Sequence, residues 1–161
     1  MYSVPAFERK LCKTGEFTTR VAKLPHPLVF TNGCFDVLHR GHVTYLAQAR
    51  ALGAALIVGV NSDASVKRQG KGDDRPINSE QDRMMVLAAL ESISLVVLFE
   101  EDTPLNLIIA CRPDILVKGG DWQPANIVGA KEVQSWGGTV HSIPFLHDRS
   151  TTSLLRKIRS L

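Results

Sequence analysis

The sequence predicts an α/β fold in which five parallel strands form a doubly wound sheet. Short apolar segments alternate along the chain with segments whose apolar residues recur at helical spacing, an order typical of parallel sheets covered by helices. The apolar segments are continuous rather than alternating, as expected for strands that are buried on both faces. With 161 residues, the chain has the length of one domain.

Four of the expected strands centre on apolar runs that end at polar or glycine residues, and the fifth mixes apolar and polar residues. They occupy residues 28–32, 55–60, 95–99, 114–117 and 139–143. The segment before them contains Pro5, Pro25 and Pro27 and shows no sustained period. We therefore expect residues 1–27 to form an N-terminal appendage and residues 28–161 to form the domain.

Helical spacing predicts helices over residues 41–52, 79–90, 103–111, 125–136 and 152–161. Ser79 is a typical N-cap, Pro104 suits a first turn, and the two glycines at 137 and 138 end the fourth helix. The side chains expected to face the core are Val43, Leu46, Ala47 and Ala51 in the first helix and Met85, Val86, Ala89 and Leu90 in the second.

Composition excludes several classes of protein. The residues are 44% hydrophobic and 22% charged, as in ordinary globular proteins. No apolar run approaches the roughly 18 residues of a membrane span, and the N-terminus lacks the apolar stretch of a signal peptide, so we expect a cytoplasmic protein without a membrane partner. A net charge of +3 does not call for nucleic acid. Three scattered cysteines without a CxxC pair disfavour a disulfide scaffold or a structural zinc site.

Polar clusters follow four of the expected strands, and in a doubly wound sheet such clusters meet at the ligand-binding edge. No GxGxxG or Walker A motif is present, which disfavours a dinucleotide oxidoreductase and a P-loop kinase. Instead, His39-Arg40-Gly41-His42 opens the first expected helix. Histidines three apart share one side of a helix, and a helix N-terminus favours phosphate. Two unrelated polar histidines are the alternative, which the position after the first strand disfavours.

The segment TNGCFDVLHRGH at residues 31–42 resembles the GxFDxxHxGH signature of the cytidylyltransferase-like nucleotidyltransferases. Residues 150–153, Ser-Thr-Thr-Ser, resemble the second signature of that family. Between them, NSDAS at 61–65, RP at 75–76, EDTP at 101–104 and LVKGGD at 116–121 look like the adenylyltransferases of bacterial ADP-heptose synthesis. The resemblance covers residues 28–161. It implies a Rossmann-like nucleotidyltransferase of the HxGH type, in a stand-alone form without the sugar kinase to which many relatives are fused.

The resemblance also implies a reaction. AMP would pass from ATP to D-glycero-β-D-manno-heptose 1-phosphate, giving ADP-heptose for lipopolysaccharide core synthesis and releasing pyrophosphate. Positioning and charge stabilisation supply most of the catalysis in such transfers. The implied partners are ATP and the sugar phosphate. Mg²⁺ would arrive with ATP, held by phosphates and water rather than by a protein metal site.

By this resemblance the catalytic residues are His39, His42 and Lys71, with Lys67 as a competing candidate for the lysine that reaches the α-phosphate. Arg149 matches the family pattern less well than Ser150, because relatives carry an arginine several residues earlier. The residues implied to bind the nucleotide are Asn32, Gly33, Cys34, Phe35, Gly41, Lys118, Gly119, Asp121, Ser150, Thr151 and Thr152. Those implied to bind the second substrate are Asp36, Lys67, Arg75 and Arg83.

Three alternatives stay open from the sequence. A glycerol-3-phosphate cytidylyltransferase, or another small nucleotidyltransferase, would share the HxGH motif and the serine–threonine run. A catalytically silent nucleotide-binding domain is a different class, which the retained histidines and loop lysine disfavour. A fragment of an aminoacyl-tRNA synthetase is disfavoured by the near-neutral charge. We also expect a homo-oligomer, with a dimer as the favoured form.

Overall fold

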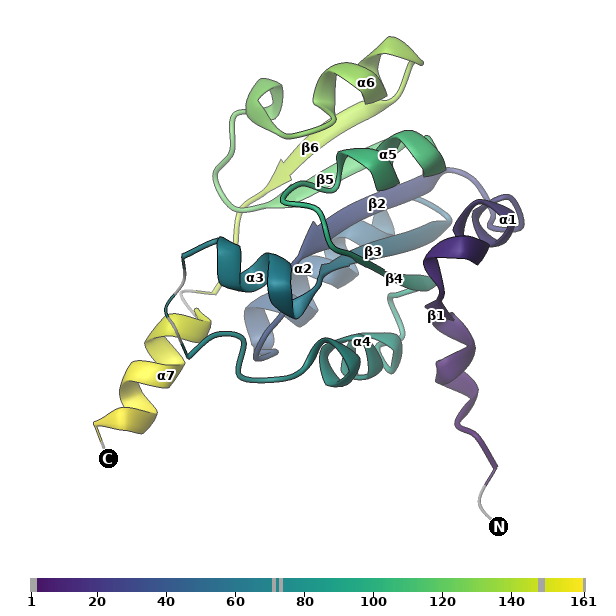
Figure 1. Cartoon of the computed structure of the whole chain (residues 1–161). Helices are drawn as coiled ribbons and strands as arrows, with labels where there is room; N and C mark the ends of the chain where they lie inside the picture. The colour runs from purple at the N-terminus through teal and green to yellow at the C-terminus, as the bar shows by residue number, and fades with distance from the viewer. Residues whose placement is uncertain (1–2, 71, 73, 148–149, 161) are drawn as a thin grey trace.

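A computed structural model describes residues 3–70, 72, 74–147 and 150–160 of the chain. Its centre is a parallel sheet of six strands in the order β1-β4-β3-β2-β5-β6 (Figure 1). The strand bounds are β1 Leu11–Cys12, β2 Leu28–Gly33, β3 Ala55–Asn61, β4 Leu95–Phe99, β5 Ile115–Gly119 and β6 Thr139–Ile143. The α/β class and the parallel pairing are as predicted, and five of these strands lie where the sequence places them.

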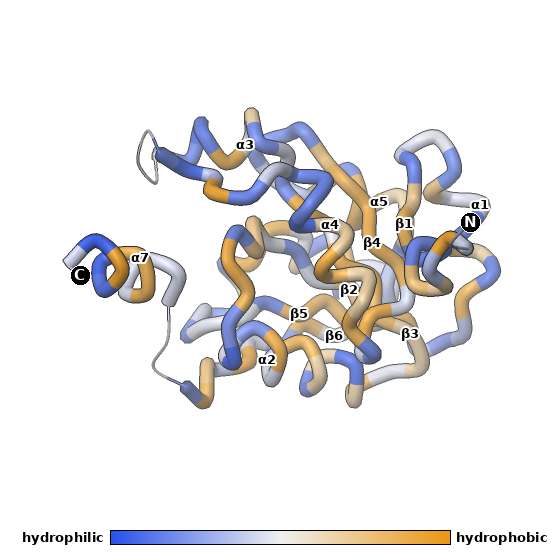
Figure 2. The backbone as a smooth tube through the Cα atoms, turned by 90° about the horizontal axis from the view of Figure 1, so that it is seen from below, coloured by the Kyte–Doolittle hydropathy of each residue, from blue (hydrophilic) through white to orange (hydrophobic). Residues whose placement is uncertain are grey.

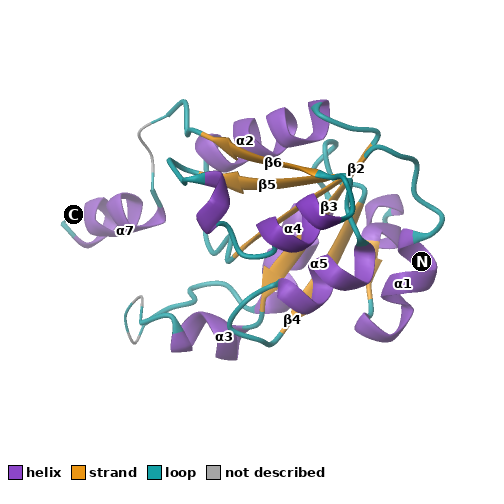
Figure 3. Ribbon diagram, turned by 90° about the horizontal axis from the view of Figure 1, so that it is seen from above, coloured by secondary structure: helices purple, strands orange, loops and turns teal. Residues whose placement is uncertain are grey.

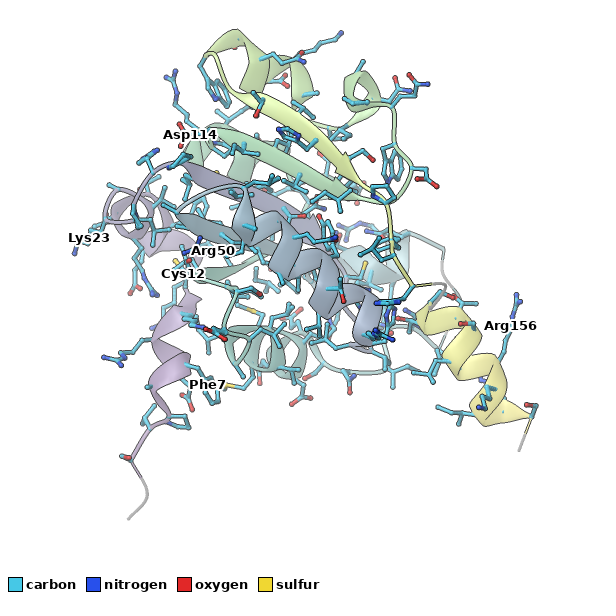
Figure 4. All side chains as sticks on the ribbon, turned by 180° about the vertical axis from the view of Figure 1, so that it is seen from behind. Phe7, Cys12, Lys23, Arg50, Asp114 and Arg156 are labelled. Atoms are coloured by element: carbon cyan, nitrogen blue, oxygen red, sulfur yellow. The ribbon has the colours of Figure 1, made fainter. Side chains whose placement is uncertain are left out.

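The sixth strand corrects the predicted count of five. β1 comes from the N-terminal segment and pairs in parallel with β4, Leu11 opposite Val96 and Cys12 opposite Val97. A strand of two residues is too short to give an apolar run, so the sequence pattern could not reveal it. After β1, the short helix α1 (Phe17–Val21) buries Phe17 against the sheet. The N-terminal segment therefore extends one edge of the sheet; Figure 4 labels Cys12 there.

Helices cover both faces of the sheet, as Figure 3 shows from above. One apolar cluster joins the sheet to α1, α5 (Leu105–Cys111) and α6 (Ala130–Ser135). A second cluster, on the opposite face, joins it to α2 (Arg40–Ala51) and α4 (Glu80–Ala88). α3 (Asp63–Arg68) follows β3 directly and is not among the helices predicted from the sequence. Short 3₁₀ turns occupy Ala6–Lys10, Thr14–Glu16 and Pro124–Asn126.

Two helices bury faces that differ in part from those predicted. In α2 Leu46 is buried as predicted, together with Tyr45 and Ala49, while Val43 is 43% exposed. In α4 the buried residues are Arg83, Leu87 and Ala88, while Val86 is 52% exposed. The physical reason is the same in both helices, because each turns a polar side chain inward where buried partners satisfy it. Ser79 does cap α4, since its hydroxyl accepts from the backbone N–H of Asp82.

The last helix, α7 (Thr151–Arg159), buries none of its residues and projects from the sheet (Figures 1 and 2). Its N-terminus is closed by a capping box between Ser150 and Ser153. Arg156 lies on this helix, far from the sheet (Figure 4). Within the residues that the structure describes, no helix is both long enough and apolar enough to cross a membrane.

The topology fixes where a ligand can bind. β2 is paired with β3 on one side and with β5 on the other. From β2 the chain adds β3 and β4 on one side and then returns to add β5 and β6 on the other side. The carboxyl ends of strands flanking such a switch point form a crevice. β2 ends at Gly33 and leads, through residues 34–39, into α2. The paired histidines therefore stand at this crevice.

Candidate active site

The imidazole rings of His39 and His42 form a stacked pair at the start of α2. Their centroids are 3.8 Å apart and the ring planes are inclined by 24°. Phe35 meets His42 edge to face at 5.4 Å. The Nδ1 atoms of both histidines are buried and make no hydrogen bond of ordinary geometry to any residue that the structure describes. Buried polar atoms normally have a partner, which makes this pair a candidate site for contact with a ligand.

Both rings are held in the neutral form near neutral pH. Burial lowers the pKa of His42 to about 4, and the neighbouring His39 contributes to the shift. Burial also lowers the pKa of His39. A neutral imidazole presents one N–H donor. An anion placed against the rings would favour the protonated form and raise the pKa again.

Two hollows open at the crevice and share a wall made of Asn32, Gly33, Cys34 and Lys118. The first, which we call the histidine chamber, holds about 260 Å³. The second, which we call the tryptophan chamber, holds about 220 Å³. The further residues of the histidine chamber are Phe35, Asp36, His42, Tyr45, Arg75, Gly119, Phe145, Thr151 and Thr152. Those of the tryptophan chamber include Asn61, Gln69, Asp102, Trp122, Asn126 and Val128.

The shared wall places a cation between the chambers. Lys118 follows the buried part of β5, and its Nζ donates to Asn32 Oδ1 at the end of β2 over 3.2 Å. Gly119 lies next to it, where a Cβ atom would come within 2.8 Å of the Phe145 ring. The backbone can be this close only because residue 119 has no side chain.

Asp36 stands under the loop rather than in open solvent. Its Oδ1 accepts from the backbone N–H groups of Ile77 (2.8 Å) and Asn78 (2.9 Å), and its Oδ2 pairs with the Arg75 guanidinium. Burial acts to raise the pKa of Asp36, but the N–H groups of Asn78 and Ile77 and the guanidinium outweigh it and hold the pKa below its ordinary value. These contacts tie the loop after β2 to residues 75–78.

Arg83 is buried beneath the site, with a side chain that is 0% exposed. Its guanidinium donates to the carbonyl oxygens of Cys34 (2.6 Å), Asn61 (2.8 Å) and Asn78 (3.2 Å). It also pairs with Asp63 at 2.8 Å. The carbonyls belong to three separate segments, so this one side chain holds the ends of β2 and β3 and the start of α4 together. Arg83, predicted to touch the second substrate, here contacts protein groups and lines neither chamber.

The remaining predicted residues divide into four groups. Thr151 and Thr152, at the start of α7, line the histidine chamber, and Thr151 Oγ1 donates to the Val37 carbonyl over 3.3 Å. Lys67 and Asp121 are exposed and line neither chamber. Lys71 and Arg149 lie outside the described residues. Two further predicted residues have local structural roles. Gly41 packs against the His39 ring, and Ser150 caps α7.

Sequence reasoning missed Tyr45, whose hydroxyl is buried between Thr31 Oγ1 and the Val117 carbonyl. A signal was present, because Tyr45 is three residues after His42 and so shares its helix face. Phe145, Gln69, Asp102 and Asn126 were also missed. They come from loops after different strands, and no spacing in the sequence brings them together.

The doubly wound parallel sheet of six strands is a Rossmann-like fold of the kind found in nucleotidyltransferases. Within this class, the chain belongs to the cytidylyltransferase-like family, whose model matches residues 30–155. It is 56% identical to the D-beta-D-heptose 1-phosphate adenylyltransferase of Bordetella bronchiseptica, over 95% of this chain and 96% of that protein. It is also 50% identical to the bifunctional protein HldE of Methylobacillus flagellatus, over 94% of this chain but 31% of that protein. The chain thus spans about a third of the length of such bifunctional relatives.

Solved structures agree with the fold. The lipopolysaccharide core biosynthesis protein from Thermoplasma volcanium matches 76% of this chain and 98% of its own, with a TM-score of 0.60 and 28% identity. The pantoate-beta-alanine ligase from Francisella tularensis matches 88% of this chain and 68% of its own, with a TM-score of 0.61. The latter is 14% identical and supports the fold alone.

Proposed function

We propose that the protein transfers AMP from ATP to D-glycero-β-D-manno-heptose 1-phosphate, giving ADP-heptose and pyrophosphate for the lipopolysaccharide core. The observation that carries this proposal is the 56% identity to a heptose 1-phosphate adenylyltransferase along 95% of the chain, combined with an anion-ready histidine pair in a two-chambered crevice. In the reaction, a phosphate oxygen of the sugar attacks the α-phosphorus of ATP. The bond from that phosphorus to the bridging oxygen breaks, and pyrophosphate leaves.

The triphosphate belongs in the histidine chamber. His42 and the hydroxyl groups of Thr151 and Thr152 line this chamber and can donate to phosphate oxygens there. His39 does not line it, but it stacks on His42 at the N-terminus of α2, where backbone N–H groups favour phosphate. Because the rings are neutral before binding, they take up charge as the anion arrives, which suits groups that stabilise a departing pyrophosphate. Lys118 in the shared wall is placed to hold the two reacting phosphates together.

Mg²⁺ bound to ATP would neutralise part of the triphosphate charge. Among the described residues, no group of three or more His, Cys, Asp or Glu side chains could hold a metal ion. Asp36 is the one carboxylate among the described residues of the histidine chamber, and it is engaged by Arg75 and two backbone N–H groups.

A pyrophosphate-release assay tests the proposal with ATP or CTP against heptose 1-phosphate or glycerol 3-phosphate. We expect turnover with ATP and heptose 1-phosphate. Turnover with CTP and glycerol 3-phosphate alone would establish the alternative cytidylyltransferase activity, and ATP binding without turnover would establish a silent nucleotide-binding domain. The homodimer remains a prediction, and light scattering on the purified protein checks it.

A further inference from the structure

The indole of Trp122 is held in a fixed position at the tryptophan chamber. Its Nε1–H donates to the Gly119 carbonyl over 3.1 Å, and its backbone N–H donates to Ser142 Oγ over 3.0 Å. The residue nevertheless remains 50% exposed. The polar edge of the ring is therefore satisfied by protein, and what the ring offers a ligand is its apolar face. The orientation is set before any ligand binds, which lowers the entropic cost of stacking on it.

Polar side chains surround this aromatic surface. Gln69 and Asn126 supply amide groups, which both donate and accept. Asp102 supplies a carboxylate that is 76% exposed and has one oxygen engaged by Arg68 Nε at 2.7 Å. Ile127 and Val128 add apolar surface to the same chamber. An aromatic face next to amides and a carboxylate matches a sugar ring, which has C–H groups on its faces and hydroxyls around its edge.

We propose that the tryptophan chamber binds the ring of the sugar phosphate, with Trp122 stacked on a C–H face and Asp102, Gln69 and Asn126 hydrogen-bonded to ring hydroxyls. This inference rests on the proposed function and assigns the part of the site that selects the acceptor. Lys118 and Asn32 lie in the wall between the chambers, so an acceptor phosphate held there directs its sugar away from the histidines. Glycerol 3-phosphate has no ring to cover Trp122, so the chamber discriminates against it.

The central variants are Trp122→Ala and Trp122→Phe, with Trp136→Phe as the matched control. Trp136 also donates its indole N–H, to the Pro113 carbonyl over 3.1 Å, but it packs against the core under α6 and lines neither chamber. For Trp122→Ala we expect the KM for heptose 1-phosphate to rise about five- to tenfold, as for loss of one aromatic contact. The KM of Trp122→Phe for heptose 1-phosphate should lie between those of the wild type and Trp122→Ala. The KM for ATP should stay within twofold of the wild-type value in all of these variants. Trp136→Phe should leave both KM values unchanged.

Selectivity gives a second readout. Trp122→Ala should lower the ratio of kcat/KM for heptose 1-phosphate to kcat/KM for glycerol 3-phosphate, and Asp102→Asn should lower it further in combination. A general loss of stability would reduce both rates together and leave the ratio unchanged. An unchanged acceptor KM in Trp122→Ala would overturn the inference, and so would a rise confined to the KM for ATP, which would mean that the indole stacks on adenine.

Binding without turnover separates this inference from the proposed function. The chain has two tryptophans, so in Trp136→Phe the emission comes from Trp122 alone. Titration with heptose 1-phosphate should change that emission, and titration with glycerol 3-phosphate should change it much less. A saturable change without any ADP-heptose formation would support the sugar site and refute the transferase activity. Formation of ADP-heptose with no change in emission would support the transferase activity and refute the sugar site.

Discussion

The neutral His42 ring makes stability depend on pH, and the size of the effect follows from the structure. The pKa falls from an ordinary 6.5 to about 4 in the folded protein, whereas the unfolded chain keeps the ordinary value. Between pH 4 and pH 6.5 the unfolded chain carries this proton and the folded protein does not. The free energy of unfolding is therefore at its full value above pH 6.5 and decreases as the pH falls toward 4. At pH 5 the loss is at most about 2 kcal/mol, because each pKa unit is worth about 1.4 kcal/mol and the ring is not fully buried, so solvent screens part of the effect.

The assay is urea unfolding at several pH values from 4.5 to 7.5, for the wild type and for His42→Asn. The asparagine does not titrate, so the variant should lose less stability than the wild type between pH 7 and pH 5, by up to about 2 kcal/mol. His39 is shifted in the same direction and leaves some pH dependence in the variant. His141→Asn is the control, since His141 is an exposed residue on β6. Equal pH slopes in His42→Asn and the wild type, or a wild type that gains stability on acidification, would refute the reasoning.

Three further predictions concern the supports of the site. Asp36→Asn should destabilise the protein by about 3–5 kcal/mol in urea unfolding, because it leaves the buried Arg75 guanidinium without its counter-charge; Arg68→Gln, which breaks an exposed pair, should cost less than about 1 kcal/mol. Gly41→Ala should lower turnover without lowering the unfolding midpoint. Its Cβ would come within 3.0 Å of the His39 ring, whereas alanine favours the helix by up to about 1 kcal/mol, so a variant of unchanged kcat would contradict this reading. Lys67→Ala should keep near-normal kcat, since Lys67 is exposed and lines neither chamber, while the resemblance to the family predicts a large loss for Lys71→Ala; the opposite result would exchange their roles.

Most of the sheet could be predicted because β2, β3, β4 and β5 centre on continuous apolar runs that end in polar residues. β3, for example, is buried at every residue from Ala55 to Asn61, and such a run has no other stable place in a small domain. β1 could not be predicted, since two residues carry no pattern and its pairing with β4 is decided by tertiary contacts. The HxGH turn could be predicted because its residues are adjacent in the chain.

Hydrophobic patterning predicts that charged residues are exposed, and this expectation is wrong for the buried residues Arg83 and Asp36. Arg83 looks like a solvated or substrate-binding residue on a helix, yet it is the centre of the buried face of α4. Its placement depends on three carbonyl oxygens from segments far apart in sequence, and a local pattern contains no information about them. The same holds for Asp36, whose partners lie about forty residues further along the chain.

These two buried groups explain how a site made of loops can be rigid. Asp36 and Arg83 both fasten the loop after β2 to the segment that enters α4, one from its side chain and one through the Cys34 carbonyl. Cys34 on that loop and Asn32 at the end of β2 belong to the wall shared by the two chambers. Loss of the Asp36 or Arg83 hydrogen bonds would therefore shift the shared wall, where the two reacting phosphates are expected to lie. In-line transfer is sensitive to displacements of about 1 Å. Damage to either support should lower kcat for any acceptor, whereas damage to Trp122 should change which acceptor is preferred.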